Sequence, residues 1–78
     1  PNPFNPTTTL SFDVAATSFV QVAVYDLLGR QIQVLVNETR DAGRHSVQLN
    51  AGDLSSGLYI VRMEASGRVF ERAITLIK

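Results

Sequence analysis

The sequence predicts an all-β protein, a small antiparallel sandwich of about six or seven strands. Three observations indicate this class. Apolar and polar residues alternate in short runs, turn residues separate the runs, and the runs recur roughly every 8–12 residues. A chain of 78 residues has room for a single hydrophobic core, so we expect one domain over residues 1–78.

The clearest strand lies at 58–64, directly after a polar turn that ends at Gly57. Its odd-numbered residues form a wholly apolar face, while the opposite face begins apolar and ends charged. That pattern is typical of a strand whose start is covered on both sides. We therefore expect a central strand around which the others pair, preceded by a positive φ angle at Gly57.

Three further strands are predicted in the first half of the chain, at 7–14, 19–25 and 31–36. Between the last two, Asp26 and Gly29 indicate a turn. A helix over 26–36 is the alternative, because leucine and isoleucine residues there could form an apolar stripe. Gly29 near the middle of that helix would cost about 1 kcal/mol relative to Ala, so we favour a strand.

Two more strands are predicted in the second half, at 44–50 and 69–78. Ser66 and Gly67 indicate a tight hairpin before the closing strand, which we expect at a sheet edge. Asp53 could cap one short helical turn that ends at Gly57.

The opening segment Pro1-Asn2-Pro3-Phe4-Asn5-Pro6 should run extended and stiff, because three prolines fix φ and remove three N–H donors. Two interpretations stay open for it: a linker from an upstream domain, or a fixed lid or recognition segment. It could also add a seventh, edge segment to the sandwich.

The predicted core consists of apolar residues at matched period-two positions. They are Phe12, Val22, Val24, Val34, Val47, Leu49, Tyr59, Val61 and Leu76.

Composition argues against several function classes. The net charge is zero and the seven basic residues are scattered, which argues against a nucleic-acid partner and an anionic membrane surface. No apolar run approaches the roughly 18 residues of a transmembrane segment. Without cysteine there is no disulfide framework and no Cys-based zinc site. The chain starts with neither Met nor a signal peptide, so we expect a domain excised from a larger secreted protein.

No catalytic, metal-binding or cofactor-binding residue is expected, and the chain is not predicted to be an enzyme. The single histidine, His45, falls at a position of its strand that is expected to face inward. This favours a structural role over a role in a metal site or a catalytic triad. The carboxylates are dispersed, and six short strands leave no cleft for a sugar ring. Tyr59 is predicted to be a structural tyrosine whose hydroxyl bonds nearby backbone, with a binding role as the alternative.

Four stretches together resemble a known family. In chain order they are Pro1-Asn2-Pro3-Phe4-Asn5-Pro6, Val24-Tyr25-Asp26-Leu27-Leu28-Gly29-Arg30, Ala42-Gly43-Arg44-His45 and Leu54-Ser55-Ser56-Gly57-Leu58-Tyr59. Their order and spacing resemble the type A C-terminal sorting domain of the type IX (Por) secretion system, and the related immunoglobulin-like module named for the flagellar hook-capping protein. Each motif alone is weakly specific, whereas the four in order cover essentially the whole chain. The resemblance implies that the sandwich is immunoglobulin-like.

The resemblance also implies a non-catalytic secretion tag at the C-terminus of large proteins in Bacteroidetes-type bacteria. The cargo, in the same chain, would first reach the periplasm, and an outer-membrane translocon would then recognise the folded tag. In many cargoes a sortase-like protease removes the tag, and the cargo is anchored at the cell surface. The alternative function is an immunoglobulin-like spacer, or an adhesion or carbohydrate-associated module of a multidomain surface enzyme.

The matching motifs imply a set of recognition positions: Pro1, Asn2, Pro3, Phe4, Gly29, Gly43, Leu54, Gly57, Tyr59 and Lys78. The closing stretch 72–78 is similar to the family's final motif, a Lys-flanked apolar strand, and Lys78 fits it. Arg72 and Ala73 depart from it, because the family often has lysines there. An open final strand suits pairing with a partner by strand addition.

Overall fold

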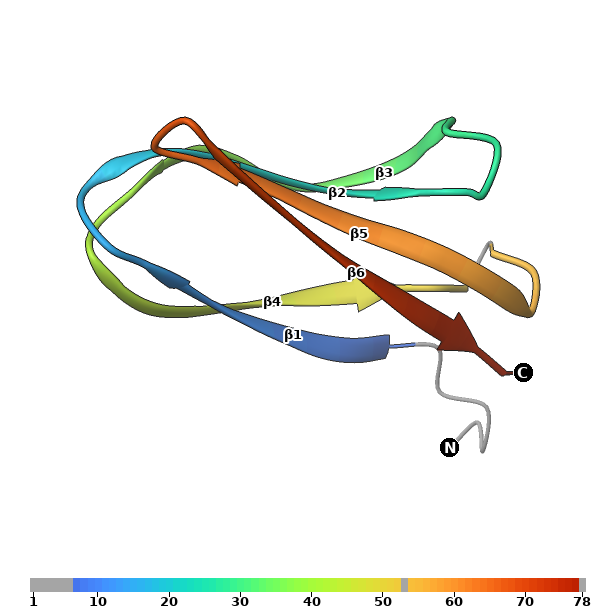
Figure 1. Ribbon diagram of the computed structural model, residues 1–78. Helices are drawn as coiled ribbons and strands as arrows, with labels where there is room; N and C mark the ends of the chain where they lie inside the picture. Colours follow the sequence, from blue (N-terminus) through green and yellow to red (C-terminus); the bar gives the residue numbers. More distant parts are fainter. Residues whose placement is uncertain (1–6, 53, 78) are drawn as a thin grey trace.

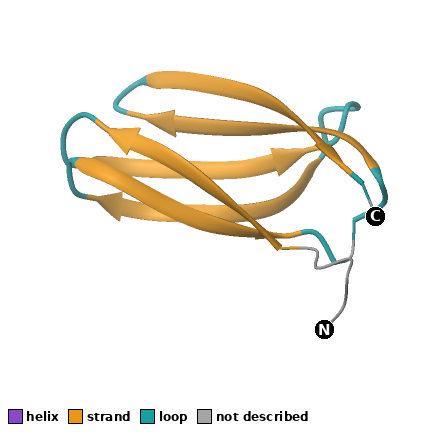
Figure 2. Ribbon diagram, turned by 90° about the horizontal axis from the view of Figure 1, so that it is seen from below, coloured by secondary structure: helices purple, strands orange, loops and turns teal. Residues whose placement is uncertain are grey.

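The computed structural model describes residues 7–52 and 54–77, and within them it is an all-β fold (Figures 1 and 2). Its strands are β1 (Thr7–Val14), β2 (Ser18–Tyr25), β3 (Gln31–Arg40), β4 (Gly43–Asn50), β5 (Gly57–Ala65) and β6 (Arg68–Leu76). The predicted fold class is confirmed, and 26–36 forms a turn and a strand rather than a helix. The expected seventh segment within residues 1–6 and the cap at Asp53 lie outside the described residues.

The strands form two antiparallel sheets stacked as layers (Figure 1). One sheet contains β1 and β4, and the other has the order β3-β2-β5-β6. Two predictions are confirmed by this order: β5 is a central strand, flanked by β2 and β6, and β6 is an edge strand. The lower layer has two strands and the upper layer four, so the lower layer cannot cover the whole inner face of the upper one.

Asp26 organises the turn between β2 and β3. Its Oδ1 accepts hydrogen bonds from the backbone N–H groups of Leu28 and Arg30, each at 2.9 Å. Its Oδ2 lies 2.7 Å from Nε of Arg30. The backbone bond from Gly29 N–H to the Asp26 carbonyl oxygen, 3.1 Å long, closes the turn. The predicted turn is therefore confirmed, with an aspartate that bonds the backbone ahead of it.

The core consists of two clusters that meet between the layers. The first surrounds Val20, Val22 and Val36, and the second surrounds Val24 and Leu49. Most of the predicted core residues belong to these clusters, either fully or partly buried: Phe12, Val22, Val24, Val47, Leu49, Tyr59, Val61 and Leu76.

The prediction that Val34 points inward is wrong. Val34 is 50% exposed, whereas Val36 is only 3% exposed. Along β2, Val22 pairs with Val36 and Ala23 pairs with Val34, so Leu35 is an extra residue in β3. This β-bulge breaks the period of two, and the residues before it face the opposite side of the sheet. Leu35 itself packs against both core clusters.

Candidate recognition surface

His45 has contacts that suit a structural role. Its Nε2 lies 2.7 Å from the carbonyl oxygen of Asp41, and its ring stacks on Phe12 with the ring centroids 5.6 Å apart. Within the described part of the chain, no three histidine or acidic side chains gather as metal ligands. The features that point to recognition are instead a corner, a strand edge and a groove.

The corner lies where the connection from β4 turns into β5. The Tyr59 hydroxyl donates a hydrogen bond of 2.8 Å to the carbonyl oxygen of Ser55. Leu54 is 9% exposed and belongs to the second core cluster, and its backbone N–H donates to the Ala51 carbonyl oxygen at 3.0 Å. The predicted structural tyrosine is confirmed, and together these contacts hold the connection against the sandwich.

Gly57 begins β5 inside this corner, with a φ of 157°. A Cβ added there would lie 4.0 Å from the Tyr59 ring, an ordinary van der Waals distance. The constraint at this position is therefore the backbone conformation, which L-residues rarely adopt, and not a lack of space. Gly57 pairs with Leu76, so the corner and the end of β6 are joined in one ladder.

Four of the recognition positions implied by the sequence gather at one end of the molecule, which we call the motif end. It comprises the turn 26–30, residues 51–52 and 54–56, the start of β5 and the C-terminal end of β6 (Figure 1). Gly29, Leu54, Gly57 and Tyr59 lie there. Gly43 does not, because it starts β4 and pairs with Val14 at the opposite end. Pro1, Asn2, Pro3, Phe4 and Lys78 lie outside the described residues.

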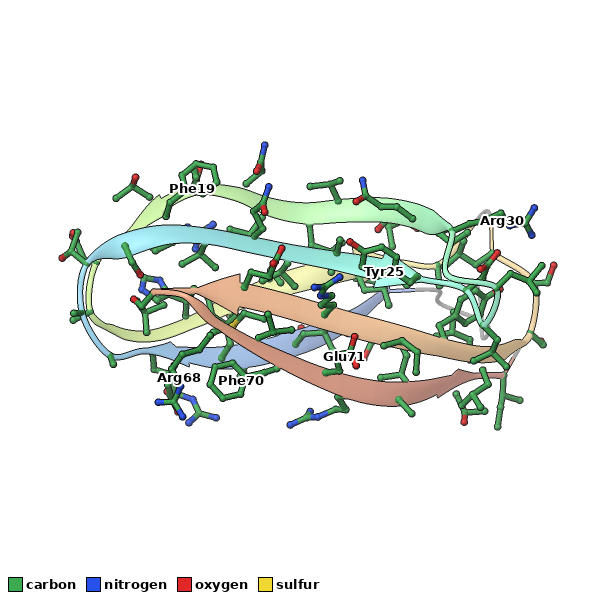
Figure 3. All side chains as sticks on the ribbon, turned by 45° about the horizontal axis from the view of Figure 1, so that its top comes forward. Phe19, Tyr25, Arg30, Arg68, Phe70 and Glu71 are labelled. Atoms are coloured by element: carbon green, nitrogen blue, oxygen red, sulfur yellow. The ribbon has the colours of Figure 1, made fainter. Side chains whose placement is uncertain are left out.

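The free edge of β6 runs away from the motif end. β6 pairs with β5 along one side only, and after it Ile77 is 88% exposed. Phe70 has the inward parity of β6 but is 49% exposed, and the guanidinium of Arg68 lies 5.4 Å from its ring centroid (Figure 3). Because the Phe70 ring is half exposed at an inward-facing position, the two-stranded sheet does not extend far enough to cover it.

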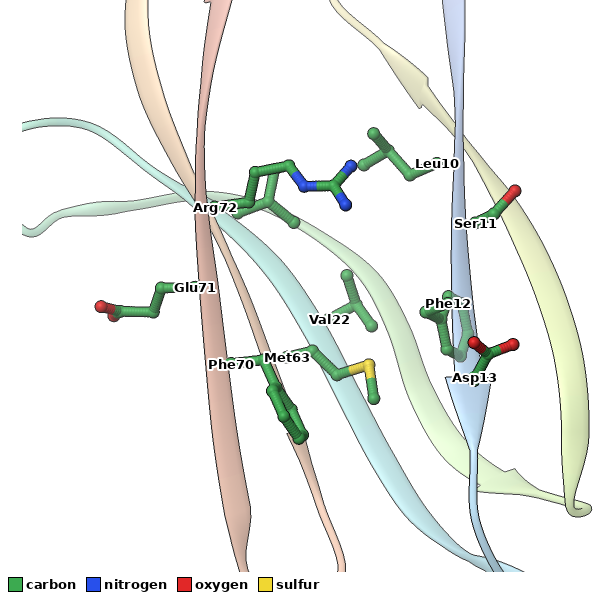
Figure 4. A pocket seen from close by; sticks show the side chains of 10 residues that line it. Leu10, Ser11, Phe12, Asp13, Val22, Met63, Phe70, Glu71 and Arg72 are labelled. Carbon is green, nitrogen blue, oxygen red and sulfur yellow. The ribbon is translucent and has the colours of Figure 1, made fainter.

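A groove of about 490 Å³ opens at this place, between β1 and β6 (Figure 4). Apolar side chains from both layers line it, and Asp13, Glu71 and Arg72 add charge. Sequence reasoning missed the groove, because periodicity gives the inward residues of each strand but not how far one layer covers the other. The one available signal was Arg72, a charge on the apolar parity of its strand.

A family model described as the secretion system C-terminal sorting domain matches residues 1–77. The chain belongs to this family. Its sorting domain is that of type IX secretion, as the four motifs indicate, and the match spans the corner, the groove and β6. No curated protein was found to match the chain.

Family membership gives the sorting domain a general role. It is a C-terminal sorting signal of type IX secretion, which implies interaction with that secretion machinery and export across the outer membrane. Of the residues that the structure describes, none belongs to a helix long and apolar enough to cross a membrane.

Proposed function

We propose that this sorting domain is a folded tag which the outer-membrane translocon reads at β6 and at the motif end. The observation that carries the proposal is the pairing of Gly57 with Leu76, which fixes the free edge of β6 against the Tyr59 corner. The edge offers unpaired backbone groups for strand addition, and the corner holds it in place. Lys78 would add a charged end for a partner carboxylate.

The finer steps follow from the same family and are part of the proposal. Residues 1–78 form one tag unit behind a cargo in the same chain. The cargo passes through the periplasm, the translocon exports it, and a sortase-like protease then removes the tag. The product is secreted or anchored at the cell surface. No residue of the tag takes part in chemistry on the cargo.

Export of a fused reporter tests the proposal. Residues 1–78 joined to the C-terminus of a periplasmic reporter are expected to send it outside a type IX host. Deletion of Ile77 and Lys78 is expected to reduce export sharply while the fold persists, because Ile77 is 88% exposed and β6 ends at Leu76. Circular dichroism and thermal melting of the shortened domain check the fold.

Val34→Thr is the matched control, because it changes a side chain that is 50% exposed on the opposite edge strand, β3. Its reporter is expected to be exported like the parent. A shortened tag that folds and is exported at the parent's rate would place recognition elsewhere on the sandwich. A parent fusion that stays in the periplasm would favour a spacer or adhesion module.

A further inference from the structure

The groove between β1 and β6 is bounded by two strand edges. Within the described sheets β1 pairs only with β4, and β6 pairs only with β5, so each has one edge without a neighbouring strand. Figure 4 shows these strands on either side of the groove. The N–H and C=O groups along such edges can take up an additional strand.

The floor of the groove is apolar, and the side chains that form it pack into the hydrophobic core. Val22 is 3% exposed, and Val61 and Met63 pack against the first core cluster. The sides are less complete: Phe12 is partly buried on β1, and Phe70 is 49% exposed on β6. An extended segment with apolar side chains at alternate positions would lie on this floor and cover the Phe70 ring.

Charge decides what kind of segment fits. Arg72 occupies an inward position of β6, and its side chain points across the groove toward Leu10 (Figure 4). None of the ion pairs between described residues includes Arg72.

The two carboxylates that line the groove lie near other arginines. Asp13 lies 3.7 Å from Arg44, and Glu71, which points away from the groove, lies 4.0 Å from Arg62. Arg72 is therefore the charged side chain that reaches across the groove, where a ligand would meet it.

A second copy of this chain is a poor occupant on the same grounds. Pairing of β6 with β6 of another copy would bring Arg68 and Arg72 of both strands together, against a single Glu71 in each. Like charges on neighbouring strands are destabilising. A strand that carries a carboxylate avoids this repulsion and neutralises Arg72.

We propose that the groove takes an extended strand of a partner protein, added to the free edge of β6. Alternate apolar side chains of that strand lie on the floor, and a carboxylate on the same face meets Arg72. The proposal rests on the sorting function only for the origin of the strand, which we assign to the outer-membrane secretion machinery. Residue chemistry thus restricts the partner to an acidic, alternating β-segment.

Two nine-residue peptides test this, with the sequences Val-Thr-Val-Thr-Glu-Thr-Val-Thr-Val and the same with Gln at the centre. Each is titrated into the isotope-labelled 78-residue chain, and amide and methyl NMR signals are followed. The Glu peptide is expected to shift amides of β1 and β6 and methyl groups of Leu10, Val61 and Met63, but not those of the β3 edge. The Gln peptide is expected to bind about tenfold more weakly, because a charge-assisted hydrogen bond to Arg72 is lost.

Variants of the chain give the matched comparison. Arg72→Gln is expected to remove the preference for the Glu peptide, and Arg72→Glu to prefer a peptide with Lys at the centre. Arg40→Gln removes the same charge at the end of β3, outside the groove, and it is expected to keep the parent's preference.

Three results would overturn the proposal. They are equal affinity for the Glu and Gln peptides, signal changes confined to the β3 edge, and dimerisation through β6 without peptide. An exported reporter combined with any of these leaves the sorting function intact and removes only the groove. Peptide binding without export would keep the groove as a binding site but remove the sorting function, because the groove would then serve a partner outside secretion.

Discussion

At the scale of single residues, Tyr59 ties a loop to a strand by one hydrogen bond and a partly buried ring. Tyr59→Phe is expected to lower the free energy of unfolding by about 1 kcal/mol, because the Ser55 carbonyl oxygen loses its donor. Tyr59→Ala is expected to cost about 3 kcal/mol, the lower end for a large aromatic side chain, since the ring is not fully buried. Urea denaturation measures both values.

Tyr25→Phe is the control for this pair, because the Tyr25 hydroxyl reaches only the exposed side chain of Gln31, at 3.3 Å. We expect a change within about 0.5 kcal/mol. Equal losses for the Tyr25 and Tyr59 variants would mean that the corner bond adds nothing special.

Asp26 gives the stability a dependence on pH. The backbone N–H of Arg30, together with its side chain and the N–H of Leu28, holds the pKa of Asp26 below its ordinary value. A lowered pKa in the folded state stabilises the fold above the unfolded value, about pH 4, and this contribution disappears as the pH falls through the folded pKa. Asp26→Asn is expected to be less stable than the parent at pH 7, and the difference is expected to shrink toward pH 2. Thermal melting across this range checks it, and a constant difference would contradict the assignment.

At the scale of an element, the bulge at Leu35 decides which valines of β3 are in the core. Val and Thr have nearly the same shape, so replacing one by the other places a hydroxyl at a chosen site. Val36→Thr is expected to cost about 1–3 kcal/mol, because the hydroxyl is buried. Val34→Thr is expected to change the stability by less than about 0.5 kcal/mol, because that side chain faces water. Similar losses for the two variants would instead support simple alternation, in which Val34 and Val36 share the inward face.

The β5–β6 hairpin turns through two residues of positive φ, 52° at Ser66 and 74° at Gly67. Two such angles in succession define a type I′ turn, for which Asn-Gly is the preferred pair. Ser66→Asn is expected to raise the free energy of unfolding by about 0.5 kcal/mol, since Asn tolerates this conformation better than Ser. Gly67→Ala is expected to lower it by about 1 kcal/mol. A stabilising Gly67→Ala would be incompatible with the turn described here.

At the scale of the whole molecule, the layers predict an order of hydrogen exchange. β2 and β5 are the interior strands of the larger sheet, and Val20 and Val24 of β2 are 0% exposed. Their amides are expected to exchange most slowly, while those of the edge strands β3 and β6 exchange faster through local opening. Exchange mass spectrometry or NMR measures the order. Uniform protection over all strands would mean that the sandwich opens only as a whole.

The parts of this fold that could be predicted from sequence are those with a local cause. The turn at Asp26, the Ser66-Gly67 hairpin and the central position of β5 each follow from residue types within a few positions. The orientation of Val34 could not be predicted, because a bulge arises from the match between two strands and leaves no mark in either alone. The groove depends on the relative width of two sheets, which is a property of the assembled layers. The resemblance implied recognition positions, but their gathering at one end emerged only from the strand register.

The chain enters and leaves the sandwich at the same end, since β1 starts and β6 finishes there (Figure 1). These two strands lie in different sheets and are each held by one partner. A force that draws residue 7 away from residue 77 would peel Thr7 from Asn50 and Leu76 from Gly57 first, then the following pairs one at a time. Strands loaded in this way lose their ladder hydrogen bonds one pair at a time, whereas strands sheared along their length have to break all of these bonds together. The domain is therefore expected to offer low mechanical resistance when its two ends are drawn apart.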